Sequence, residues 1–149
     1  ASTSMWRTAG ERITHKLVAA DGVAVVDAGR LRSPVPIVAA SDLLAVLANP
    51  VADQLVALTH LVPTLRHAVR VRVAVVLVGG GPYGVGDVEQ SVGVTVIGQL
   101  PNDPDAAEAL RVGGSRSRLA RSRLARAVGA LGGELSSALL ELTTAGAAS

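Results

Sequence analysis

The chain has 149 residues, a length typical of one domain that buries about two thirds of its unfolded surface. Its 14 basic and 12 acidic side chains leave a net charge of +2, and the lack of cysteine excludes disulfides and thiolate metal sites. No apolar run approaches the roughly 20 residues of a membrane span, and no secretory signal pattern is found. We therefore expect one cytoplasmic domain over residues 1–149.

The predicted core is aliphatic. Apolar residues make up 49% of the chain, yet Phe is absent and Trp and Tyr occur once each. A core of Val, Leu, Ala and Ile is typical of parallel strands buried under helices.

The N-terminal third predicts a helix followed by two strands. Residues 4–20 carry apolar side chains at helical spacing, and residues 23–27 (VAVVD) predict the first strand. Pro34 and Pro36 predict a loop, and residues 42–48 predict the second strand.

The middle of the chain predicts a helix and the third strand. Asn49-Pro50 is typical of a helix start, with Asn as N-cap and Pro in the first turn. The helix is expected to reach about Val69, with a kink at Pro63, and residues 71–78 predict the strand. One face of the helix carries the residues Leu55, Leu58, Val62, Leu65 and Val69.

The remainder predicts a short helix at 85–92, a fourth strand at 94–98 and a helix between an Asp103 cap and Gly113-Gly114. A long final helix is expected over residues 115–142, followed by a flexible tail at 143–149. Its apolar face consists of Leu124, Val128, Leu131, Leu135 and Leu142.

Strands that alternate with helices predict an α/β fold with a parallel sheet of about four strands flanked by helices, in a Rossmann-like three-layer arrangement. Right-handed crossovers place the C-terminal ends of all strands at one edge, where such sheets bind ligands. Asp27, Asn49, the loop 79–84 and Asp103 are all expected at that edge.

Asp27 has two interpretations. A carboxylate at a strand end can hold Mg²⁺, directly or through water, and so position nucleotide phosphates. The alternative is a turn-forming Asp ahead of Gly29 that needs no ligand.

The loop GGGPYG (79–84) matches G-x-G-x-x-G and could bind a dinucleotide pyrophosphate. Pro82, the short following helix and a next strand that ends in Gln99 instead of an acid favour a plain connection. In QLPNDPDAAEAL (99–110), helix capping explains the acids without any ligand.

The arginines are unevenly distributed: 13 of the 14 basic residues are Arg, and Lys16 is the single lysine. The sequence SRLAR occurs twice in succession, at 117–126. This segment could dock its leucines on the core and leave the arginines in water, bind DNA phosphates, or lie on an anionic membrane. The arginines concerned are Arg116, directly before the repeat, and the four within it, Arg118, Arg121, Arg123 and Arg126.

Other catalytic sites lack support. His60 and His67 lie opposite the buried stripe of their helix, without a partner at metal-ligand spacing. No G-x-S-x-G or Ser–His–Asp pattern indicates nucleophilic catalysis.

Taken in order, five segments over residues 20–130 resemble the C-terminal half of MinD/ParA-type ATPases, a P-loop NTPase fold, and are most similar to the actinobacterial MinD-like and CpaE-like branch. The segments are VVDAGR, SDLLAVLANP, VAVVLVGGGPYG, GVTVIGQLPNDPDAAEALRVGG and the Arg-rich last helix.

The resemblance implies ATP and Mg²⁺ as cofactors of the complete family domain. Asp27 matches the Walker B-type Asp that organises magnesium and water. Pro101 and Asp103 match the turn that contacts adenine, and Gly79 or Gly80 stands where the family commonly has a base-reading Asn. The implied process is chromosome partitioning, septum placement in cell division, or pilus and secretion assembly through a nucleotide-dependent dimer.

The family's glycine-rich phosphate loop with two lysines normally precedes the Walker B strand. Because Lys16 lies in a predicted helix without such a loop, we expect the 149 residues alone neither to bind ATP tightly nor to hydrolyse it. The expected partners are a second copy or a missing N-terminal half, paired at an open sheet edge. The alternatives are a non-catalytic protein- or DNA-interaction module and a dinucleotide-binding domain.

Overall fold

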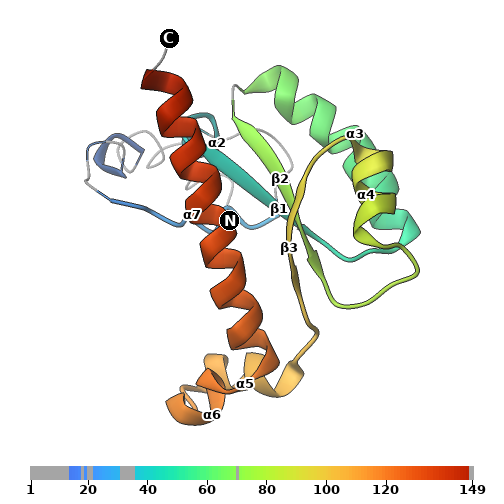
Figure 1. The fold of residues 1–149 in the computed structure, drawn as a ribbon, viewed down its shortest axis with the longest axis vertical. Helices are drawn as coiled ribbons and strands as arrows, with labels where there is room; N and C mark the ends of the chain where they lie inside the picture. Colours follow the sequence, from blue (N-terminus) through green and yellow to red (C-terminus); the bar gives the residue numbers. More distant parts are fainter. Residues whose placement is uncertain (1–13, 18, 20–21, 31–35, 70, 148–149) are drawn as a thin grey trace.

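The computed structural model describes residues 14–17, 19, 22–30, 36–69 and 71–147, with side chains through residue 142. Its centre is a parallel sheet of β1 (Leu43–Ala48), β2 (Arg72–Val78) and β3 (Val96–Leu100), in that order. The helices α3 (Ala52–Ala68) and α4 (Val85–Val92) cover one face, and α7 (Arg123–Ala147) crosses the other (Figure 1). The prediction of an α/β fold with a parallel sheet flanked by helices is confirmed.

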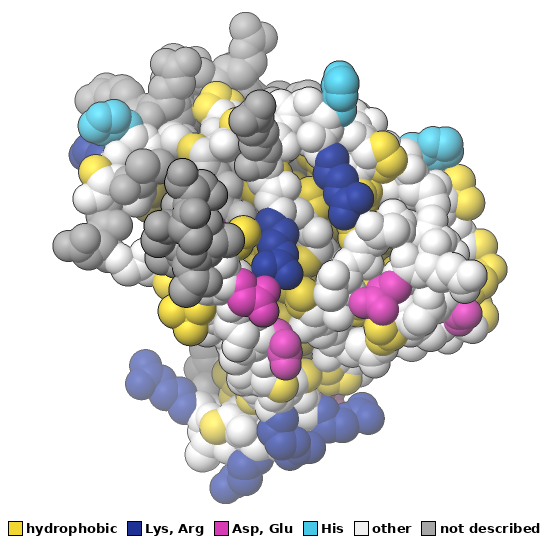
Figure 2. Space-filling view, turned by 45° about the horizontal axis from the view of Figure 1, so that its top comes forward, with side chains coloured by type: hydrophobic (Ala, Val, Ile, Leu, Met, Phe, Trp, Pro, Cys, Tyr) yellow, Lys and Arg dark blue, Asp and Glu magenta, His cyan; other side chains and the backbone are white. Residues whose placement is uncertain are grey.

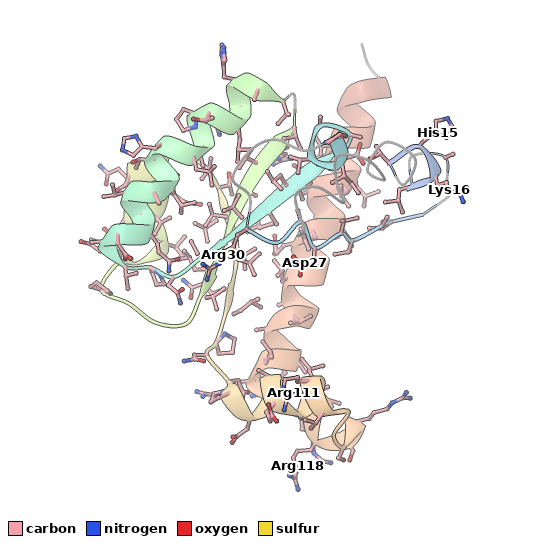
Figure 3. All side chains as sticks on the ribbon, turned by 180° about the vertical axis from the view of Figure 1, so that it is seen from behind. His15, Lys16, Asp27, Arg30, Arg111 and Arg118 are labelled. Atoms are coloured by element: carbon pink, nitrogen blue, oxygen red, sulfur yellow. The ribbon has the colours of Figure 1, made fainter. Side chains whose placement is uncertain are left out.

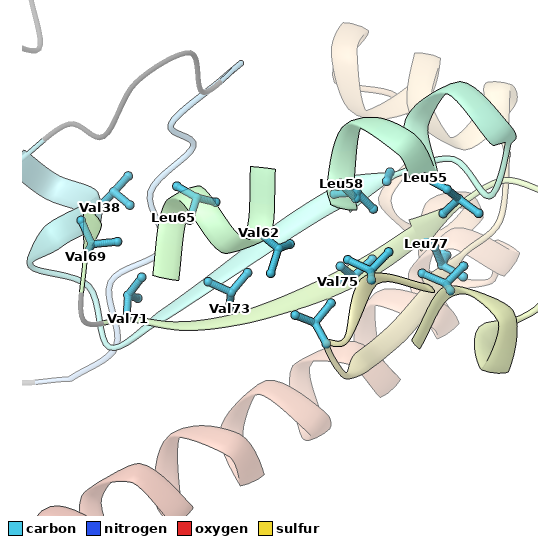
Figure 4. Packing of buried hydrophobic residues seen from close by; sticks show 14 of the residues in the cluster. Val38, Leu55, Leu58, Val62, Leu65, Val69, Val71, Val73, Val75 and Leu77 are labelled. Atoms are coloured by element: carbon cyan, nitrogen blue, oxygen red, sulfur yellow. The ribbon is translucent and has the colours of Figure 1, made fainter. Parts of the chain in front are cut away.

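The main core lies between α3, α4 and the sheet. The predicted stripe of α3 is buried at Leu55, Leu58, Val62 and Leu65. These side chains face alternate residues of β2, of which Val75 and Leu77 are 0% and 1% exposed (Figure 4). Each buried Val or Leu side chain contributes roughly 1.5–3 kcal/mol relative to an exposed one, so this layer determines the fold.

The opposite face of the sheet packs against α7. Alternation along β2 directs the buried Ala74 and Val76 to this side. On β3, Gly98 makes room for α7, because a Cβ there would lie 2.9 Å from Leu131 Cδ1. Leu131 is half-buried, whereas Val128 on the predicted apolar face is half exposed. The leucines of the terminal helix therefore dock on the sheet, as one of the three interpretations predicted.

The first predicted strand is not present. Residues 23–29 have no regular secondary structure, and Val23 and Val25 are 76% and 90% exposed. An apolar run becomes a strand only where a neighbouring edge pairs with it, and no backbone hydrogen bond joins this segment to β1 among the described residues. The described part of the sheet therefore has three strands, not four.

Two further predictions concern the N-terminal region, a helix over residues 4–20 and a loop around Pro36. Residues 14–17 are helical, while most of the predicted helix 4–20 and Pro34 lie outside the described residues. The expected loop around Pro36 contains the short helix α2 (Pro36–Ala39) instead. Burial of Ile37 and Val38 in the main core explains this helix, because apolar contacts stabilise a turn that polar loop residues would not.

The start of α3 differs from the prediction. Its N-cap is Val51, not Asn49, because Asn49 is held by other partners: its N–H donates to Gln54 Oε1 over 2.7 Å. The helix continues through Pro63 to Ala68, and the kink stays a prediction. The strand β3 begins at Val96, two residues later than predicted, whereas α4 has the predicted bounds.

The predicted final helix is divided. After α5 (Pro104–Val112) the chain forms α6 (Arg116–Ala120), and α7 starts only at Arg123. The side-chain oxygen of Ser122 accepts the Ala125 N–H over 3.0 Å and so caps a new helix. The helix α7 extends to Ala147, into the predicted tail. Within the described part of the chain, no helix has the length and apolar content that crossing a membrane requires.

Candidate functional site

The C-terminal ends of the three strands meet at one edge of the sheet, as the parallel topology requires. We call this edge, formed by Asn49, Gly79, Gly80, Pro101 and Asp103, the carboxyl edge. Its strands are joined beyond the ladder by two contacts. Asn49 Nδ2 donates to the Val78 carbonyl, and the Gly79 N–H donates to the Leu100 carbonyl, each over 2.8 Å.

Gly79 lies at the centre of the carboxyl edge. Its φ of 74° is in the left-handed region that favours glycine. A Cβ at this position would lie 3.5 Å from Asn49 Nδ2 and 3.8 Å from Asn102 Cβ. Two asparagines from neighbouring strand ends therefore flank the glycine that stands at the predicted base-reading position. The sequence analysis gives Asn102 no role. Its amide side chain, directly before Asp103, is the feature that could have identified it as part of this edge.

The glycine loop rests on the junction between β1 and α3. A Cβ at Gly81 would overlap the carbonyl group of the buried Pro50, so the two backbones are in direct contact. Gly80 has open space around it and is exposed. The loop thus presents the backbone groups of Gly80 to solvent, while Gly81 anchors it.

Acids occupy the helix starts at this edge. Asp87 Oδ2 accepts the Gly84 N–H over 2.8 Å at the start of α4, and Asp53 lies in the first turn of α3. A carboxylate in the first turn interacts favourably with the positive dipole end of a helix, the same end that can bind a phosphate. These two acids therefore add negative charge at the helix starts where a phosphate would bind.

Asp103 connects two helices. Its Oδ1 accepts the Ala106 N–H over 3.1 Å, which confirms the predicted cap of α5. Its Oδ2 accepts the Leu124 N–H of α7 over 3.4 Å. Both carboxylate oxygens thus have protein partners, and the side chain is half-buried. Asp103 therefore links α5 to α7, and the adenine contact implied by the resemblance stays a prediction.

Asp27 lies on the irregular segment 22–30, with Arg30 further along it (Figure 3). The carboxylate is exposed and accepts the Gly29 N–H over 2.8 Å. This contact is the turn geometry of the alternative interpretation. It makes no hydrogen bond to the carboxyl edge, and no three His, Asp or Glu side chains of the described residues form a group that could hold a metal ion.

Lys16 lies on the helical residues 14–17, on the opposite side of Figure 3 from α4 and the glycine loop. A lysine that binds phosphates must reach the same oxygens as the loop amides. The described arrangement therefore brings together Gly79, Gly80, Pro101 and Asp103, the residues predicted for the base side of a nucleotide site, whereas Lys16 lies apart from the glycine loop.

Other charged residues have ordinary surroundings. Glu108 and Arg111 form an exposed ion pair of 2.7 Å on α5. The hydrogen bond from Arg111 lowers the pKa of Glu108, and the same bond raises the pKa of Arg111. His60 and His67 are exposed, as predicted. The hydrogen bonds and ion pairs described for these groups do not include a residue of the carboxyl edge.

Comparison of the chain with protein-family models, curated proteins and solved structures gives no match. The parallel sheet and the contacts at its carboxyl edge are therefore the basis of the functional proposal.

Proposed function

We propose that the chain is the C-terminal part of a MinD/ParA-like ATPase domain and contributes the base-binding side of a nucleotide site. In this proposal the complete domain serves the spatial positioning of chromosomes, the division septum or a pilus or secretion assembly. The observation that carries the proposal is the position of Gly79, between Asn49 and Asn102 at the carboxyl edge of a parallel sheet. Ligands of open α/β sheets bind at this edge.

The P-loop type of fold, with a fourth strand, is part of the proposal. The β1–β2 register leaves the backbone groups of Leu43, Ala45 and Leu47 directed away from β2, without a backbone partner among the described residues. Leu47 is 63% exposed at this edge. A further strand would satisfy these groups.

The segment 23–27 has a connection to β1 that suits a parallel strand. Residues 28–42 exceed the dozen or so residues that a parallel crossover needs. Their helix α2 packs into the same core as α3, on the face that a right-handed crossover in this direction requires. We therefore infer that 23–27 joins the sheet in the complete domain, either on β1 itself or beside a strand inserted between them, which would bring Asp27 toward the carboxyl edge.

The 149 residues by themselves are proposed not to hydrolyse ATP. The acids at the starts of α4 and α5 repel phosphate, and Lys16 is the single lysine of the sequence. ATP and Mg²⁺ would bind only when a glycine-rich loop with lysine is supplied by further sequence or by another chain.

Calorimetry with magnesium-ATP tests this proposal. We expect no binding in the micromolar range by the 149-residue chain, and binding by a chain lengthened with any upstream sequence of the reading frame that encodes a glycine-rich lysine loop. In the lengthened chain, Asp27→Ala should abolish hydrolysis, whereas Asp42→Ala, an exposed acid before β1, should leave it intact. Micromolar affinity of the short chain, or a lengthened chain that carries the loop but does not bind magnesium-ATP, would contradict the proposal.

A second candidate function is a non-catalytic interaction module. The open edge of β1 favours it, because LLAVLA carries neither the charge nor the proline that usually protects an edge strand. Sedimentation equilibrium separates the candidates: the module associates with a second copy or a protein partner with no effect of ATP, and Ala45→Pro weakens that association.

A further inference from the structure

The two asparagines that flank Gly79 at the carboxyl edge differ in what their amides bind. The side chain of Asn102 is exposed and has no hydrogen-bond partner among the described residues. Its Cβ lies 3.8 Å from the position that a Cβ of Gly79 would occupy, so this side chain starts beside the bare backbone of the glycine. Because an amide carries both donors and an acceptor, Asn102 offers both kinds of hydrogen bond to a ligand at this edge.

Asn49 does not offer the same groups. Its Oδ1 accepts an N–H of Gln54 Nε2 over 3.0 Å, while its Nδ2 donates to the Val78 carbonyl. The backbone N–H of Asn49 also donates to Gln54 Oε1, so the two residues form a closed pair. Turning the Asn49 amide toward a ligand would break contacts that join β1, α3 and β2. Asn49 is therefore part of the framework of the edge, and Asn102 carries the amide that is open to a ligand.

The backbone around Asn102 is held on both sides. Before it, the Leu100 carbonyl accepts the Gly79 N–H over 2.8 Å, and the ring of Pro101 fixes its own φ. After it, Asp103 is bonded through both carboxylate oxygens to N–H groups of α5 and α7. A free side chain on a fixed backbone suits selective binding, because little conformational entropy is lost when it bonds a ligand.

We propose that Asn102 is the residue that selects the base at the carboxyl edge, and that it favours adenine. An asparagine amide pairs with adenine in bidentate geometry, since its oxygen accepts the N6–H and its N–H donates to N7. Guanine presents two acceptors, O6 and N7, at the same edge of the ring and leaves the amide oxygen unpaired. The inference rests on the proposed function, because it assigns the residue that distinguishes bases within that nucleotide site.

Nucleosides are the probes that test this residue. Arginine side chains gather at the end of the molecule formed by α5, α6 and the start of α7, the dark-blue group at the bottom of Figure 2. The phosphates of a nucleotide would interact with such charges wherever its base is bound. Adenosine and guanosine carry no charge, so their binding reports the base alone.

Nuclear magnetic resonance titration of the full 149-residue chain measures binding residue by residue. We expect millimolar adenosine to shift the side-chain amide of Asn102 and the backbone amides of Gly79 and Gly80, with an affinity at least about fivefold above that of guanosine. Asn102→Ala should remove this preference without changing the melting temperature. Asn102→Asp should reverse it, because a carboxylate accepts the N1–H and N2–H donors of guanine but cannot donate to N7 of adenine.

Gln90→Glu is the matched control, because it makes the same change from amide to carboxylate at an exposed position in the last turn of α4. It should leave the preference for adenosine unchanged. If nucleosides shift Gly79 and Gly80 without a preference for adenosine, or with one that both Asn102 variants retain, the assignment of Asn102 is wrong, while the base-binding role of the edge stands. If neither nucleoside shifts the edge, that role is wrong as well.

Discussion

The core under α3 and the arginine tip differ in what stabilises them. The arginine tip is the end of the molecule that carries Arg116, Arg118, Arg121, Arg123 and Arg126. In the core, Val62, Val75 and Val88 are each 0% exposed, and no charged side chain is buried among the described residues. At the tip, five charged side chains are exposed around two half-buried leucines, and helix caps hold the helices together. Apolar burial stabilises a fold by several kcal/mol per cluster, whereas a cap contributes about 1 kcal/mol. The described core is thus held by apolar packing alone, whereas the tip combines two half-buried leucines with helix caps and exposed charge.

The largest expected effect belongs to the core. Leu77 of β2 is 1% exposed and belongs to the layer under α3. Replacing it with Ala should lower the free energy of unfolding by about 2–5 kcal/mol, because apolar burial is lost and a cavity forms. Urea denaturation measures it. Val56→Ala on the exposed side of α3, where the side chain is 59% exposed, should stay within about 0.5 kcal/mol. Equal costs at the two positions would mean that this layer does not carry the stability.

A smaller effect is expected where the core meets the carboxyl edge. Gly81→Ala should cost about 1–3 kcal/mol, because its Cβ would overlap the Pro50 carbonyl and displace the glycine loop. Gly80→Ala is the matched control: its Cβ has open space, so thermal unfolding should be unchanged. If both variants melt alike, the contact between the loop and β1–α3 is not as close as described.

The smallest of the three effects concerns the tip. Asp103→Ala should cost about 0.5–2 kcal/mol, because the N–H groups of Ala106 and Leu124 lose their acceptor. Asp103→Asn keeps one acceptor oxygen and should cost less. Hydrogen exchange should become faster in residues 104–126 but not in β2. Faster exchange throughout the sheet would show that the tip and the core unfold together, and would contradict their separate stabilisation.

Several elements could be predicted from local sequence because the cause of each is local. The α3 stripe, the strand at 71–78 and the helix 85–92 follow from apolar spacing, and the Asp103 cap with Gly113 as stop follows from backbone chemistry. The convergence of Gly79, Pro101 and Asp103 at one edge was also predictable, since parallel topology dictates it.

What the sequence determined by itself is therefore α3, α4 and α5, the strands β1 and β2, and the edge at which the strand ends meet. The tertiary structure decided whether an apolar run becomes a strand: 23–27 has the composition of one, but no edge pairs with it here. It also decided that Asn49 joins β1 to β2 instead of capping α3, and that Ser122 divides the arginine helix. Such choices depend on which partners lie within hydrogen-bonding distance, and periodicity along one segment does not contain that information.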